Sequence, residues 1–187
     1  MKKISSAILL LSLLPSCAAL NNFNKPSELD SISKGAKFDI KKFFEGDVEG
    51  FAIIQDSSGK IIDTEALKIN GKWDGNKGVI QQNFVYASGN KDSRTWLITM
   101  DESGSTFSAI GHDIAAPAQG KQVGNAMQMI YALMLPGKMD KQKVKVNFED
   151  KIYLVDDESA IMISNFAAGF SSPSKSIISL KKVKKAE

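Results

Sequence analysis

The sequence has few of the residues that build reactive or metal-binding centres: of its 187 residues, one is cysteine and one is histidine. A single cysteine excludes an internal disulfide, so the fold must depend on packing. Structural zinc sites and His-centred triads need further His or Cys ligands, or a nucleophile paired with a base. We therefore interpret His112, beside Asp113, as a residue of a surface loop. No metal and no cofactor are expected.

The chain also lacks a long apolar run and an excess of one charge. The run from Ile4 to Leu14 is too short to span a bilayer as a permanent helix. Between Cys17 and Leu180, 18 basic residues face 20 acidic ones. This balance gives no electrostatic footprint for nucleic acid. The lysines of segment 181–185 are interpreted as a solvated tail, or as a contact for anionic lipid headgroups.

The acidic residues of segment 149–158 raise the question of a calcium site or of paired catalytic carboxylates. They lack the glycine and the ligand spacing of an EF-hand loop. Asp156 to Ser159 lies between apolar stretches, so we predict a hairpin turn there.

What the chain does contain at its start is an export signal. Lys2 and Lys3 precede the short apolar run, and small Ser16 stands directly before Cys17. The arrangement resembles a bacterial lipobox, in which the cysteine is acylated and the signal is removed. An ordinary secretory signal is the alternative. We predict a signal peptide over 1–16, a lipidated flexible tether over 17–36 and one domain over 37–187 with a basic tail.

The predicted destination is the outer membrane. Ala18 stands where an aspartate would favour retention in the inner membrane. In an organism with two membranes, the protein would then be anchored through acylated Cys17 and face the periplasm. Several acyl chains together give lasting attachment.

Short alternating stretches separated by turn residues make up most of the remaining chain. Only Asp39 to Phe44 reads as a helical turn, with Asp39 as its cap. The pattern predicts an all-β fold, a single antiparallel meander that closes into a barrel, because closure removes exposed strand edges. A two-sheet β-sandwich is the alternative. The predicted strands are 49–55, 60–70, 79–86, 94–100, 106–110, 127–135, 144–149, 152–155, 160–164 and 177–183.

The interior of a small barrel is either filled by side chains or holds one small ligand. The clearest alternation, along 127–135, points a row of large apolar side chains to one face. The loop that contains Gly120 and Gly124 lies before it. We take as candidate ligand-binding residues Met127, Met129, Tyr131, Leu133 and Tyr153 for the lining, and Asp113 and Asn125 as polar groups near a mouth.

Short motifs distributed over about 38–180 resemble those of the domain of unknown function 3833 family of bacterial lipoproteins. The motifs are Phe43-Phe44-x-Gly46, Gln55-Asp56-x-x-Gly59, Gly71-x-Trp73-x-Gly75, Arg94-x-Trp96, Gly120-x-x-x-Gly124-Asn125-Ala126, Tyr131-x-Leu133-x-Leu135-Pro136, Phe148-x-Asp150 and Tyr153-Leu154-x-Asp156. The resemblance implies a lipid-anchored envelope protein with a lipocalin-like barrel and no established reaction. This chain has Met129 and Lys151 where the family usually has Trp, and Met162-Ile163 in place of an Asn-Arg pair.

The function expected from these features is binding or carriage of an apolar ligand, such as a fatty acid or a phospholipid. Two alternatives remain open. One is a structural or assembly factor of the cell envelope with a filled barrel. The other is a lipid-modifying enzyme in which Asp113 and Tyr131 or Tyr153 act as acid–base groups, although no nucleophile–base pair is visible.

Overall fold

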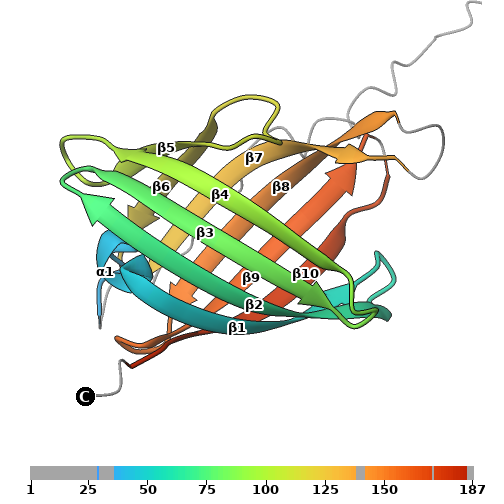
Figure 1. Ribbon diagram of the computed structural model, residues 1–187, viewed down its shortest axis with the longest axis horizontal. Coiled ribbons are helices and arrows are strands. Elements are labelled where there is room, and N and C mark those ends of the chain that lie inside the picture. The colour runs from blue at the N-terminus through green and yellow to red at the C-terminus, as the bar shows by residue number, and fades with distance from the viewer. Residues whose placement is uncertain (1–28, 30–35, 138–141, 170, 185–187) are drawn as a thin grey trace, which may run out of the picture.

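The computed structural model describes residues 29, 36–137, 142–169 and 171–184. These residues form one short helix and ten antiparallel strands (Figure 1). The elements are α1 Ile40–Phe44, β1 Gly46–Gln55, β2 Ile61–Asp74, β3 Lys77–Tyr86, β4 Lys91–Met100, β5 Thr106–Ile110, β6 Ala118–Val123, β7 Ala126–Pro136, β8 Lys143–Leu154, β9 Ser159–Ala168 and β10 Ser174–Lys182.

The strands form a closed barrel. Each strand pairs with its neighbours in sequence, and β1 pairs with β10 to close the ring. The closing register runs from Val48 opposite Lys182 to Gln55 opposite Lys175. This arrangement confirms the predicted meander and excludes the two-sheet sandwich. Closure leaves the backbone of β1 and β10 paired on both sides.

Helix α1 closes one end of the barrel (Figure 1). The Asp39 side chain accepts hydrogen bonds from the backbone N–H groups of Lys41 and Lys42, as a helix N-cap does. Ile40, Phe43 and Phe44 are buried in the core. The predicted helical turn and its cap are confirmed.

Gly71 explains how closely the helix can approach the sheet. A Cβ atom on Gly71 would overlap the backbone carbonyl of Phe44, at the end of α1. Since a backbone carbonyl cannot move aside as a flexible side chain can, β2 requires glycine at this position.

Two strand predictions were wrong in detail. The sequence predicts a loop where β6 forms, because this strand contributes few large apolar side chains to the interior. The ring of Phe107 on β5 fills the space that a side chain at Gly120 would take. Segments 144–149 and 152–155 are one strand, β8, which continues through Asp150 and Lys151. The turn predicted at Asp156 is confirmed, since its carboxylate accepts hydrogen bonds from the backbone N–H groups of Glu158 and Ser159.

The predictions for the two ends of the chain were a signal peptide with a lipidated tether and a basic C-terminal tail. The predicted signal peptide, Cys17 and nearly all of the tether lie outside the described residues. Of the C-terminal lysines, Lys182 belongs to β10 rather than to a tail. Its ammonium group donates hydrogen bonds to the carbonyls of Lys42, Phe43 and Glu45 at 2.8, 2.9 and 3.0 Å.

Candidate functional site

The barrel encloses a cavity of about 410 Å³. The inward-facing positions of eight strands form its wall. Its lining residues are Ile54, Ile62, Asp63, Glu65, Leu67, Ile69, Gln82, Phe84, Tyr86, Asp92, Arg94, Trp96, Met129, Tyr131, Leu133, Leu135, Phe148, Asp150, Met162, Ser164, Phe166, Ser176, Ile178 and Leu180. The interior is therefore not filled by side chains.

Aromatic side chains make one wall of the cavity. Tyr131 on β7 stacks on Phe148 of the neighbouring strand with ring centroids 5.0 Å apart, and Phe148 stacks on Phe166 at 5.3 Å. The Trp96 ring packs edge-to-face against the Tyr131 ring, with ring centroids 5.0 Å apart. Cross-strand aromatic pairs stabilise the sheet and hold the Tyr131 ring in place.

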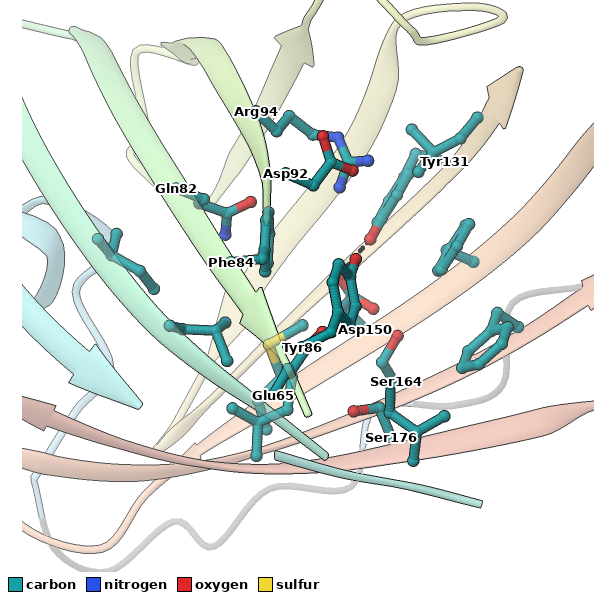
Figure 2. A pocket seen from close by; sticks show the side chains of 18 of the residues that line it. Glu65, Gln82, Phe84, Tyr86, Asp92, Arg94, Tyr131, Asp150, Ser164 and Ser176 are labelled. Carbon is teal, nitrogen blue, oxygen red and sulfur yellow. Dashed lines mark hydrogen bonds between the residues drawn. The ribbon is translucent and has the colours of Figure 1, made fainter. Parts of the chain in front are cut away.

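Asp150 is the most deeply buried acidic residue in the cavity wall, with 3% of its surface exposed. The Tyr131 hydroxyl donates a 2.8 Å hydrogen bond to its Oδ2 atom (Figure 2). Its Oδ1 atom has no hydrogen-bond partner among the described residues. Burial raises the pKa of Asp150 to about 6, although the Ser164 and Tyr131 hydroxyls and the charge of Arg94 oppose the increase.

Two serines continue from Asp150 along neighbouring strands. Ser164 on β9 lies directly opposite Asp150, and Ser176 on β10 lies directly opposite Ser164. All three side chains point into the cavity (Figure 2). The Ser176 hydroxyl is buried and has no partner among the described residues. Three adjacent strands thus place a polar row in an otherwise apolar wall.

Glu65 on β2 is a second buried acid, with 8% of its surface exposed. Burial raises the pKa of its carboxyl group to about 7; the charge of Asp63 adds to the increase, and Arg94 opposes it. Within the described part of the chain, no hydrogen bond to this carboxyl group is formed. The same burial, reinforced by the charge of Glu65, raises the pKa of Tyr86, its cross-strand neighbour.

Arg94 contributes the positive charge of the cavity wall. Its guanidinium group donates hydrogen bonds from Nε and Nη2 to the Asp113 carboxylate, at 3.0 and 2.9 Å. The ion pair is largely buried. Asp113 belongs to the loop between β5 and β6, whose backbone is also held by hydrogen bonds to β7. The pair fixes this loop against the open end of the barrel.

The structure places the predicted ligand-binding residues in three groups. Met129, Tyr131 and Leu133 line the cavity, and Asp113 reaches it only through Arg94. Met127 is packed in the core, and Tyr153 lies outside the cavity lining. Asn125 stands in the turn between β6 and β7, at the end that α1 closes, so Asp113 and Asn125 do not share a mouth. Their role in ligand binding stays a prediction.

Sequence reasoning did not select the interior charges at Glu65, Arg94 and Asp150. The alternation pattern could have identified these three residues, because each stands in phase with buried apolar residues of its own strand. A charged residue on the apolar face of an alternating strand must point into the interior.

Two further features narrow the chemistry. The described residues contain no group of three or more His, Cys, Asp or Glu side chains arranged to hold a metal ion. His112 is exposed in its loop. None of the helices in the described ranges has the length and apolar character needed to cross a membrane.

The fold and the internal cavity define a lipocalin-like β-barrel. Within that class, the chain belongs to the family described as protein of unknown function DUF3833, whose sequence profile matches residues 17–170. Among similar solved structures is the S-type phycobiliprotein lyase CPES from Guillardia theta. It has a TM-score of 0.59 and 7% sequence identity, over 80% of this chain and 95% of the lyase chain. No curated protein matched the sequence.

Proposed function

We propose that this protein binds or carries one small, largely apolar molecule inside its barrel. The cavity of about 410 Å³ carries the proposal. Binding sites for small molecules commonly measure about 300–1,000 Å³ and combine apolar walls with a few placed polar groups. The apolar side chains here surround a short row of buried polar groups, and α1 closes the far end. Such a site fits a ligand with an apolar body and one polar group.

Native mass spectrometry with solvent extraction tests this proposal. The chain is produced from residue 17 with Cys17→Ser, which keeps every described residue, and is purified without detergent. A stoichiometric small molecule that leaves the protein on extraction is the expected result. An unshifted mass after incubation with mixed envelope lipids would count against a carrier and favour an assembly factor.

A matched pair of substitutions on β10 locates the ligand. The Ser176 side chain points into the cavity, whereas Ser179 on the same strand is exposed on the outside. Ser176→Phe fills part of the cavity and is expected to abolish occupancy, whereas Ser179→Phe leaves it intact. Equal occupancy in two folded variants would place the ligand outside the barrel.

We also propose that acylated Cys17 anchors the barrel to the outer membrane on its periplasmic side. The lipobox-like order Leu14-Pro15-Ser16-Cys17 and the Ala18 that follows it support this proposal. Growth with an alkyne-labelled fatty acid should label the unaltered protein and not Cys17→Ser. Label retained in Cys17→Ser, or recovery of the labelled protein with the inner membrane, would contradict it.

A further inference from the structure

The cavity wall is rich in acidic groups. Four carboxyl side chains line it, those of Asp63, Glu65, Asp92 and Asp150. Among the lining residues Arg94 is the one cation, and the Nε–Nη2 edge of its guanidinium group already binds Asp113. A ligand therefore meets an excess of negative charge and of hydrogen-bond acceptors.

Several of these acceptors lack a donor within the protein. The Oδ1 atom of Asp150 and the Ser176 hydroxyl are buried without a partner among the described residues. Glu65, with 8% of its residue surface exposed, is a further acidic group of the wall. A buried acceptor without a donor costs about 1–3 kcal/mol of desolvation, and more when it is charged. A bound group that donates hydrogen bonds would recover this free energy.

We propose that the ligand carries a protonated amine on its apolar body, and that Asp150 accepts this group with Ser176, in the same polar row, as a further acceptor. This inference rests on the proposed cavity binding and narrows its ligand class. The two residues lie on β8 and β10, which form one continuous arc of the barrel wall with β9 between them. An ammonium group supplies both the positive charge and the N–H donors that this arc lacks.

The same wall disfavours a carboxylate headgroup, including that of an ionised fatty acid. Such a headgroup would add a further negative charge to a wall that already holds the buried carboxyl groups of Asp150 and Glu65, in a region of low dielectric constant. Arg94 gives it little compensation, because Asp113 already neutralises the guanidinium charge. Charge and hydrogen bonding therefore select for the amine.

Four probes with the same twelve-carbon chain test the inference by calorimetric titration below their micelle concentrations. They are dodecylamine, dodecyltrimethylammonium, dodecanol and dodecanoic acid. At pH 8 the amine is protonated, as a lysine side chain is, and the acid is ionised. The protein is the chain from residue 17 with Cys17→Ser.

Dodecylamine is expected to bind at least roughly tenfold more tightly than dodecanoic acid, which corresponds to one charge-assisted hydrogen bond. Dodecyltrimethylammonium, which has the charge without N–H donors, should fall between them. Dodecanoic acid or dodecanol binding as tightly as the amine would overturn the inference while leaving the cavity as a binding site. If none of the four probes bound, the proposed function itself would fail.

Two substitutions assign the effect to Asp150. Asp150→Asn should weaken dodecylamine binding roughly tenfold and leave dodecanol binding nearly unchanged, because only the charged contact is lost. Glu102→Gln, in the exposed turn between β4 and β5, is the matched control. Unchanged amine affinity in folded Asp150→Asn would overturn the assignment. If that variant does not fold, the comparison of the four probes on the protein with the unsubstituted cavity decides whether the cavity prefers an amine.

Discussion

At the scale of single residues, the cavity shows a conflict between stability and binding. Asp150 and Glu65 occupy positions where an apolar residue would pack more favourably. Burial raises the pKa of Asp150 to about 6 and that of Glu65 to about 7, because both carboxyl groups lose hydration when charged. A carboxyl group that is retained in the interior despite this loss of hydration is a candidate for a functional site.

Glu65→Gln should therefore stabilise the protein, and more strongly at pH 8 than at pH 5. Folded Glu65 holds its proton up to a pH of about 7, whereas the unfolded residue loses it near 4.5. The free energy of unfolding consequently falls as the pH rises through this interval, and glutamine removes that loss. We expect a gain on the order of 2 kcal/mol at pH 8, measured by urea denaturation.

Glu102→Gln serves as the control for Glu65→Gln, since residue 102 is exposed and should change stability little at either pH. An equal gain from Glu65→Gln at the two pH values would show that packing, rather than charge, sets its effect.

At the scale of elements, α1 is a helix that the rest of the molecule holds in place. Five residues are too few for a helix to be stable alone. Asp39 satisfies donors at its N-terminus, and the Lys182 ammonium group satisfies three carbonyls at its other end. Burial lowers the pKa of Lys182, which indicates that these carbonyls replace water around the ammonium group.

Lys182→Met should loosen this closure while keeping the apolar stem of the side chain. Loss of hydrogen bonds to a charged donor is expected to cost about 1.5–3 kcal/mol. Hydrogen exchange of the α1 amides should speed up more than exchange in β7. Lys181→Met, at the exposed neighbouring position, is the control. Unchanged α1 exchange in Lys182→Met would mean that packing of Phe43 and Phe44 alone holds the helix.

The elements differ in how well the sequence predicted them. Strand β7 was recognised because alternation and Pro136 both marked it, and four of its residues line the cavity. Strand β6 was missed because its interior space is filled by Phe107 of another strand, which no local pattern encodes. Asp150 was considered only as part of the acidic segment 149–158, although Phe148 and Ile152 share its inward phase. Alternation along β8 could predict only that the Asp150 side chain points inward. Whether the carboxyl group is buried depends on the other strands of the barrel.

At the scale of the whole molecule, barrel closure is what makes an interior site possible. The cavity wall combines residues from β1 and β2 with residues from β10, at opposite ends of the chain. Before β10 pairs with β1 and β9, no sheet surrounds the buried carboxyl groups. The binding site and the closed fold are therefore expected to form together.

Removing β10 tests this dependence. A chain that stops after residue 173 exposes the long edges of β1 and β9 and should aggregate or unfold without a cooperative transition. A chain that stops after Lys184 keeps every described residue and should melt like the complete protein. Thermal unfolding followed by circular dichroism, together with dodecylamine titration, gives the readout. Cooperative unfolding with retained amine binding in the shorter chain would show that the site does not need a closed barrel.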